Sequence, residues 1–232
     1  MKSKILKIIT FLFPLLFIGH MLFLRKNDFY VYDRIGAEDN LLEWGQFALY
    51  FLSGILAVLL AYNYRKNKAL LFIYILLTLA LLFIAIEEIS WGERLFGITR
   101  DSVVPIELME RNVQEELNFH NIDTIHSKIG YIYLIIGFFG CFSSLLLALL
   151  KRFAKIKKVF EGILRHITPS WIFFFYFFPL FINFFDMDMY GLMPQDYELA
   201  ETCLALGVFL FLLYKYIWRV DDNGLEPSTP TM

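Results

Sequence analysis

Residues 69–97 read ALLFIYILLTLALLFIAIEEISWGERLFG, an apolar run that ends abruptly in two adjacent carboxylates. The run is long enough to cross a bilayer as a helix, which needs about 20 apolar residues. Glu87 and Glu88 therefore lie where the chain leaves a hydrocarbon environment, and ionisable groups at that depth are costly and tend to be functional. This stretch predicts a membrane protein with a polar site at one end of its helices.

The composition of the whole chain agrees with that prediction. Of its 232 residues, 58% are hydrophobic, which is too many for a soluble domain of this length. We predict an all-α, polytopic helical membrane protein with one transmembrane domain over residues 1–219 and a disordered tail over 220–232. The six transmembrane spans are expected near residues 4–24, 43–63, 69–90, 128–150, 170–187 and 199–218. The first span follows a short basic start and lacks a small-residue cleavage site, so we expect it to stay uncleaved.

Lysine and arginine are distributed unevenly between the two faces that these spans define. Fourteen of the 21 fall in the N-terminal residues, in 64–68, in 151–169 and near the end of the sixth span. Basic residues favour the cytoplasmic side, so both termini are expected in the cytoplasm. Nineteen of the 23 acidic residues lie on or near the opposite, outer face.

Two connections between the spans are more than simple turns. The outer segment 91–127 is too long for a plain hairpin. The inner segment 151–169, KRFAKIKKVFEGILRHITP, places apolar residues at helical spacing between basic ones. That pattern fits either an amphipathic helix lying on an anionic leaflet or an ordinary basic loop.

Glu87 and Glu88 are the first candidates for catalysis. On a continuous helix, Glu87 would share a face with Trp91 and Arg94, while Glu88 would point about 100° away and could address a second partner. A carboxylate beside an apolar layer suits general acid or base catalysis. In the alternative, structural interpretation, Glu87 pairs with Arg94 and Glu88 caps a neighbouring helix.

A second set of candidates lies in the stretch ERNVQEELNFHNIDTIH, just before the fourth span. Glu116 and His120 are four residues apart, so on a helix they would stack and could bind one metal ion or pass one proton. His126 lies at the mouth of the span, and Asn118 and Asn121 can orient these groups by hydrogen bonds. The spacing matches no established metal motif such as HExxH, and a solvated amphipathic loop helix is the alternative.

Further acidic residues end on the same side of the membrane. Glu201 enters the sixth span more deeply than Glu198, which makes Glu201 a candidate ligand, whereas a favourable helix N-terminus is enough to explain Glu198. We interpret Asp186 and Asp188 as loop residues. Together with the acids that precede or open the second span, these groups would let five of the six helices line one polar basin at the outer leaflet.

Three stretches, AEDNLLEW, IEEISWGERLFG and RNVQEELNFHN, resemble the boxes of a family of bacterial polytopic membrane proteins of unknown function. The family's boxes are an ED…E pattern opening a helix, EEISWGQR, and N-x-Q-x-E-x-N-x-H-N, and the resemblance spans roughly residues 37–121. The matching residues are Glu38, Asp39 and Glu43; Glu87, Glu88, Ser90, Trp91, Gly92 and Arg94; and Asn112, Gln114, Glu116, Asn118, His120 and Asn121. The family has glutamine where this chain has Glu93, so Glu93 is not treated as a ligand. The resemblance indicates which residues are the stronger candidates for a functional site, but it does not indicate a reaction.

The leading hypothesis is a membrane-embedded enzyme, a metal-dependent or acid/base hydrolase or transferase, that acts on a lipid or lipid-linked substrate. Its catalytic acid/base groups would be Glu87, Glu88, Glu116 and His120, with Trp91, Arg94, Asn118 and Asn121 shaping the site. The candidate ligands of a divalent metal are Glu88, Glu116, His120, His126 and Glu201. Such oxygen and nitrogen donors suit zinc, manganese, iron or magnesium. The alternatives are a cation-coupled small-solute transporter and a non-catalytic scaffold or subunit.

We expect a multi-pass protein of the bacterial cytoplasmic (inner) membrane. Its expected partners are membrane lipids. The sequence has no GxSxG, no P-loop and no GxGxxG. It also lacks a basic stripe with interleaved aromatic residues, so we expect no nucleic-acid partner.

Overall fold

A computed structural model describes residues 2–37, 40–92, 96, 123–153, 158–183 and 193–217. Within these ranges every regular element is a helix, as the predicted all-α class requires. The long helices are α1 (Lys2–Asn27), α3 (Leu41–Asn63), α4 (Lys68–Glu88), α7 (Asp123–Phe153) and α10 (Pro194–Ile217). The short ones are α2 (Phe29–Gly36), η1 (Ser90–Gly92), α8 (Lys158–Ile167), η3 (Trp171–Phe173) and α9 (Phe174–Asn183). The tail predicted for 220–232 lies outside the described residues.

Five helical runs among the described residues are long and apolar enough to cross a membrane. They are Ile5–Asn27, Phe29–Asn63, Lys68–Glu88, Lys128–Arg152 and Pro194–Ile217. The second run includes residues 38 and 39, which are not described, and α3 is the part of it that matches the predicted span. These five helices correspond to five of the six predicted spans and support a membrane protein.

The remaining predicted span, 170–187, has a different structure where it is described. It consists of η3 followed by α9, which has 10 residues and contains Pro179. A helix of that length rises about 15 Å, half of the roughly 30 Å hydrocarbon core. Residues 184–187 lie outside the described part of the chain, so six spans remain a prediction.

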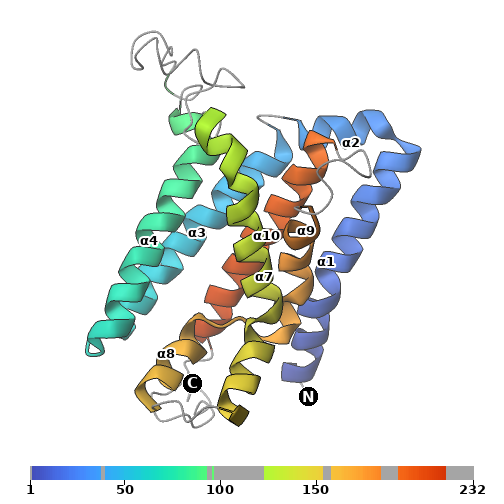
Figure 1. Cartoon of the computed structure of the whole chain (residues 1–232). Helices are drawn as coiled ribbons and strands as arrows, with labels where there is room; N and C mark the ends of the chain where they lie inside the picture. Colours follow the sequence, from blue (N-terminus) through green and yellow to red (C-terminus); the bar gives the residue numbers. More distant parts are fainter. Residues whose placement is uncertain are drawn as a thin grey trace.

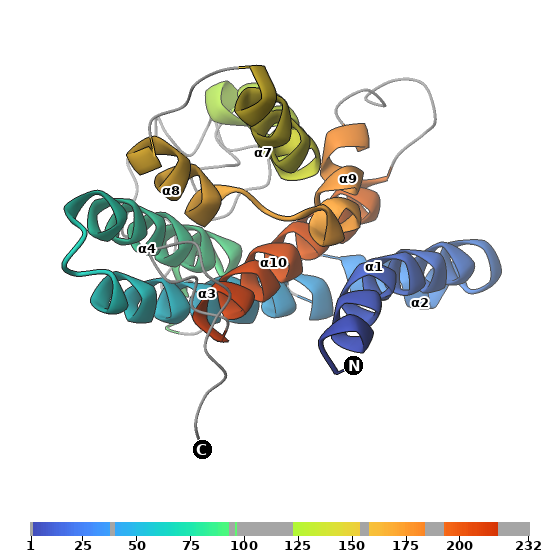
Figure 2. The same cartoon turned by 90° about the horizontal axis from the view of Figure 1, so that it is seen from below.

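The long helices run alongside one another as a bundle (Figure 1). α10 occupies the centre and packs against α3 and α9, α3 forms a hairpin with α4, and α7 packs on α9 (Figure 2). The start of α1, the α3–α4 turn, α8 and the end of α10 all lie at one end of the bundle, which we call the α8 end (Figure 1). The opposite end, where α4 ends, α3 and α10 begin and α2 lies, is called the α2 end.

Small residues allow α7 to approach α9 closely. A Cβ atom added to Gly140 would lie 2.0 Å from Cγ of Phe177, and one added to Gly137 would lie 2.7 Å from the backbone nitrogen of Phe181. Lipid tails are as apolar as leucine, so membrane helices associate through such close contacts rather than through hydrophobic burial. The two glycines therefore place α9 against α7.

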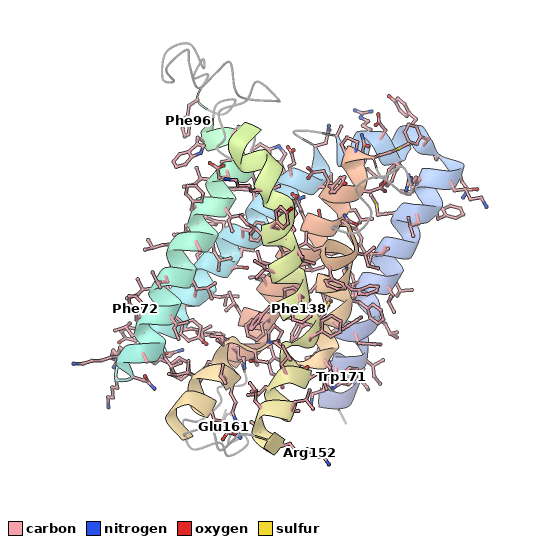
Figure 3. The ribbon with its side chains drawn as sticks, viewed as in Figure 1. Phe72, Phe96, Phe138, Arg152, Glu161 and Trp171 are labelled. Atoms are coloured by element: carbon pink, nitrogen blue, oxygen red, sulfur yellow. The ribbon has the colours of Figure 1, made fainter. Side chains whose placement is uncertain are left out.

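Large apolar side chains cover the sides of the bundle, whereas charges lie at its ends. Phe72 on α4 and Phe138 on α7 are 62% and 46% exposed. Arg152 and Glu161 lie at the α8 end (Figure 3). This distribution is the one expected of helices surrounded by lipid along their sides.

The segment 151–169, predicted to be amphipathic, contains α8, which is attached to the long helices of the bundle. Lys215 on α10 donates a hydrogen bond to the carbonyl oxygen of Arg165 at 2.6 Å, near the C-terminus of α8. The imidazole of His166 packs edge-on against the ring of Tyr64, at the end of α3, with centroids 4.6 Å apart. Glu161 pairs with Lys151 of α7 at 2.9 Å.

Candidate functional site

Carboxylates from three helices gather at the α2 end. Glu43 lies in the first turn of α3, Glu87 and Glu88 in the last turn of α4, and Glu198 and Glu201 in the second turn of α10. We call these five residues the acidic cluster. Glu88 interacts electrostatically with the other four carboxylates, most strongly with Glu201 and then with Glu198, Glu43 and Glu87. Three separate helix ends therefore contribute like charges to one region.

Two tyrosines, the buried Tyr50 and the partly buried Tyr133, lie beside the acidic cluster. The hydroxyl of Tyr133 on α7 donates a hydrogen bond to Oε1 of Glu201 at 2.5 Å. Tyr50 on α3 is 3% exposed and interacts electrostatically with Glu88, Glu201 and Glu198. A fourth helix, α7, thus takes part in the site.

Gln46 joins α3 to α10 beside these tyrosines. Its Nε2 donates to Oε2 of Glu198 at 2.9 Å and to Oγ1 of Thr202 at 3.1 Å. Thr202 in turn donates to the carbonyl oxygen of Glu198 at 2.8 Å. The Gln46 side chain is fully buried, and its Oε1 has no hydrogen-bond partner among the described residues. A buried carbonyl oxygen without a donor is costly, so Oε1 is available to a ligand, water or cation.

The backbone reverses immediately after the last turn of α4. Ser90, Trp91 and Gly92 have φ values of 46°, 56° and 75°, in the left-handed region that non-glycine residues seldom adopt. This turn folds Trp91 back, so that its Nε1 donates a hydrogen bond to Oε1 of the buried Glu87. The contact between Glu87 and Trp91 therefore comes from a reversal of the chain, not from the shared face of a continuous helix that the spacing predicted.

A further buried carboxylate at the same end, that of Asp196, has a structural role. The buried Asp196 accepts hydrogen bonds from the Tyr32 hydroxyl at 2.5 Å and from the backbone N–H of Met193 at 2.9 Å. It also pairs with Arg25 of α1 at 3.1 Å. These described contacts fix α1 and α2 to the start of α10.

Several predicted site residues lie outside the described part of the chain. They are Arg94, Glu116, Asn118, His120 and Asn121, together with Glu38, Asp39, Asp186 and Asp188. His126 lies in the first turn of α7, at the α2 end, but its side chain is not described. The predicted meeting of His120 with Glu87 or Glu88 therefore stays a prediction. The described candidates Glu87, Glu88, Trp91 and Glu201 all lie at the α2 end.

The described carboxylates do not by themselves form a complete metal site. Among the residues that the structure describes, no three His, Cys, Asp or Glu side chains are arranged to hold a metal ion. Three of the five predicted ligand side chains, those of Glu116, His120 and His126, are not included in that set.

Sequence reasoning missed the neutral members of this site, which are Gln46, Tyr50, Tyr133 and Thr202. A usable signal was present, because a polar side chain inside an apolar span tends to face the interior of a bundle. Tyrosine and threonine are also common in ordinary membrane helices, so the signal could not separate these residues from the rest.

Comparisons with protein-family models, with curated proteins and with solved structures find no match for this chain. The resemblance of its three boxes to a bacterial family therefore stays a prediction.

Proposed function

We propose that the acidic cluster is the active site of a membrane-embedded enzyme that acts on a lipid or lipid-linked substrate, with a divalent metal ion held among its carboxylates. The observation that carries this proposal is that the ends of α3, α4 and α10 bring Glu88 and four other carboxylates into one region at the α2 end. Like charges gathered with little water repel one another strongly, and only protons or a cation can offset that repulsion.

The donor atoms on this face fit a divalent ion. Carboxylate oxygens of Glu88 and Glu201 are hard ligands of the kind that magnesium and manganese prefer, and so is Oε1 of Gln46, which accepts no hydrogen bond from the described residues. Glu116, His120 and His126 would complete the set of ligands. The imidazoles of the two histidines would also suit zinc or iron. When bound, the metal would polarise a substrate oxygen or activate a water molecule.

The residues of the chain itself divide into positioning and proton-transfer groups. Tyr133 fixes Glu201, and Trp91 fixes Glu87, each by a hydrogen bond. No side chain in the described part of the chain donates a hydrogen bond to Glu88. Glu88 is therefore the carboxylate best suited to exchange a proton with a substrate, which is the role of a general acid or base.

The position of the cluster favours a substrate that lies in the membrane. The cluster is built on the ends of α3, α4 and α10, which are three of the helices long enough to span a bilayer. A lipid headgroup lies at that depth, where the hydrocarbon core meets the interface. A lipid or lipid-linked substrate could therefore present its polar group to Glu88 without leaving the membrane.

Cation-coupled transport is the second candidate function, and one observation favours it. The buried polar face of α3 continues inward from the cluster, through Gln46 to Ser53, both of which are fully buried. Polar side chains within the bundle are typical of proton and ion pathways. A cation bound at the cluster could follow this face.

We also propose six spans, with both termini in the cytoplasm and the acidic cluster outside, in the cytoplasmic membrane of a bacterium. The α8 end collects the start of α1, the α3–α4 turn and the basic α8 (Figure 1). Cysteines introduced by Lys66→Cys and Gly162→Cys should resist an impermeant thiol reagent in whole cells, whereas Tyr30→Cys should react. Labelling of Lys66→Cys from outside would reverse this orientation. The native Cys141 and Cys203 are buried and should add little background.

Elemental analysis of the detergent-purified chain tests the enzymatic proposal. We expect close to one divalent ion per chain, and its loss in both Glu88→Gln and Glu201→Gln. Glu161→Gln removes the same charge at the α8 end and should retain the metal. Metal-free protein that moves a cation into proteoliposomes in a Glu88-dependent manner would favour the transporter. Protein that neither binds nor moves a cation would fit the scaffold and would overturn both other functions.

A further inference from the structure

A cavity of about 190 Å³ opens between α1, η3 and α10 at the α8 end, far along the bundle from the acidic cluster. We call it the α1–α10 cavity. Its walls are mostly apolar, with Leu6 from α1, Ile172 from η3, and Leu210, Leu213 and Ile217 from α10. The volume is several times the roughly 30 Å³ that one water molecule occupies in the liquid, and apolar cavities are not hydrated favourably. The cavity therefore suits a hydrocarbon segment.

Lys7 stands in the wall of this apolar cavity. One turn further along α1, the ring of Phe11 packs against Trp171 at 5.2 Å and Phe175 at 5.0 Å between centroids. Residues four apart share a face of a helix, so Lys7 lies on the face of α1 that is turned toward η3 and α9. The Tyr176 hydroxyl donates to the carbonyl oxygen of Thr10 at 2.8 Å, which holds this face of α1 in place.

The charge of Lys7 has no described counterion at the α8 end. Among the described residues, Glu161 is the one acidic side chain there, and it is already paired with Lys151 at 2.9 Å and Arg165 at 2.7 Å. A lysine beside an apolar wall extends its ammonium group toward the membrane interface. An anion bound at the mouth of the cavity would supply the missing negative charge.

We propose that the α1–α10 cavity is a binding site for an anionic phospholipid, with an acyl chain between α1 and α10 and the headgroup phosphate at Lys7. Two of the three elements that line the cavity, α1 and α10, belong to helical runs that can span a membrane, Ile5–Asn27 and Pro194–Ile217. The ends of such helices lie at the depth where acyl chain and phosphate meet. A single diacyl lipid with one net negative charge matches both the apolar cavity and the ammonium group of Lys7, which pairs with no acidic side chain among the described residues. This site does not depend on the function proposed for the acidic cluster.

The test uses the full-length chain in nanodiscs of phosphatidylcholine that contain a trace of a photoreactive lipid. Two probes carry the same diazirine in one acyl chain, and their headgroups are phosphatidylglycerol and phosphatidylcholine. Mass spectrometry of the crosslinked peptides gives the labelling of Leu6, Leu210 and Leu213. One basic residue near an anionic headgroup contributes enough to favour the phosphatidylglycerol probe about fivefold.

Three variants locate the effect. Lys7→Gln should reduce the phosphatidylglycerol labelling to the phosphatidylcholine level, whereas Lys66→Gln, which removes a charge from the α3–α4 turn at the same end, should leave it unchanged. Leu213→Trp should fill the cavity and reduce labelling by both probes. Lys7 is exposed, so its replacement should not disturb folding even if Leu213→Trp does. Equal labelling by both probes in the unaltered chain, or an unchanged preference in Lys7→Gln, would overturn the proposal.

Discussion

The hydroxyl of Tyr133 lies 2.5 Å from Oε1 of Glu201 and ties α7 to α10 within the acidic cluster. These residues are 68 positions apart in the chain, and Tyr133 lies in the interior of a span whose other side chains are mostly apolar. The bond fixes the direction of one carboxylate among five that repel one another. It therefore contributes to stability and to the geometry of the candidate site at the same time.

The Tyr133→Phe variant should be less stable than the unaltered chain. Removing a hydrogen bond to a charged group costs about 1.5–3 kcal/mol when the group stays buried. The free energy of unfolding in mixed micelles measures this loss. Tyr30→Phe, at a position that is 72% exposed on α2, is the matched control and should change the free energy of unfolding by less than about 0.5 kcal/mol. Equal stability of Tyr133→Phe and the unaltered chain would show that Glu201 does not need this partner.

Asp196 should be among the most sensitive positions outside the acidic cluster. The Asp196→Ala variant removes a carboxylate that pairs with Arg25 and accepts a hydrogen bond from the backbone N–H of Met193. Breaking a buried ion pair costs about 3–5 kcal/mol, and we expect a loss toward the lower end because Arg25 is 27% exposed. The smaller change Tyr32→Phe removes one bond to the same carboxylate. In a double-mutant cycle, the two substitutions should be strongly non-additive because they share that bond. Additive losses would mean that the phenol and the carboxylate act independently.

Gly140 should tolerate no side chain. In Gly140→Ala the new methyl group would meet Phe177, and overpacking of this kind costs about 1–3 kcal/mol. The same substitution at Gly162 of α8 meets nothing within 4 Å and should stabilise the helix by up to about 1 kcal/mol. Thermal unfolding of the two variants in detergent compares them directly. The double variant Gly140→Ala with Phe177→Leu should recover part of the loss, and a failure to recover would place the strain elsewhere.

The attachment of α8 to α7 should weaken in acid. Hydrogen bonds from Lys151 and then Arg165 lower the pKa of the Glu161 carboxyl below its ordinary value of 4.5. A carboxyl whose pKa is lower in the folded state stabilises that state above the unfolded pKa, and the contribution is lost as the pH falls through the folded pKa. The contact should thus persist near neutrality, begin to weaken below about pH 4.5, and be lost as the pH falls through the lower pKa of the folded state.

Spin labels at Leu149→Cys on α7 and Gly162→Cys on α8 can measure this pH dependence. Pulsed dipolar spectroscopy should show a broader distance distribution at low pH. In a Glu161→Gln background the distribution should be broad at every pH, because the amide carries no charge to lose. A distribution that stays narrow for Glu161→Gln would show that Lys215 and His166 alone hold α8 in place.

The sequence predicted the helices well where their cause is local. Runs such as residues 69–90 are apolar throughout, so a helix that satisfies its own backbone hydrogen bonds is the structure they favour in lipid. The described helix α4 ends at Glu88, two residues before the predicted end, because the backbone turns left-handed at Ser90. The short helix α2 was not predicted, since its eight residues are held by Tyr32 and Asp196, a contact 164 positions apart.

The span predicted at 170–187 shows the limit of a criterion based on apolar composition. Its residues are as apolar as those of the other spans, yet the described part forms η3 and a 10-residue α9 containing Pro179. The glycines of α7 hold this short helix against the bundle, and composition carries no information about that packing.

The sequence by itself determined that this is a helical chain of membrane-spanning length with acidic residues at the helix ends of one side, because apolar run length and charge position are properties of neighbouring residues. Only the tertiary structure decided which acids meet, that Tyr133, Tyr50 and Gln46 stand among them, and that Asp196 is instead occupied by Arg25 and Tyr32. The physical reason is that these contacts join residues far apart in the chain. They depend on the rotation and spacing of the packed helices. Close glycine contacts and a left-handed turn determine that packing, and no local sequence pattern encodes it.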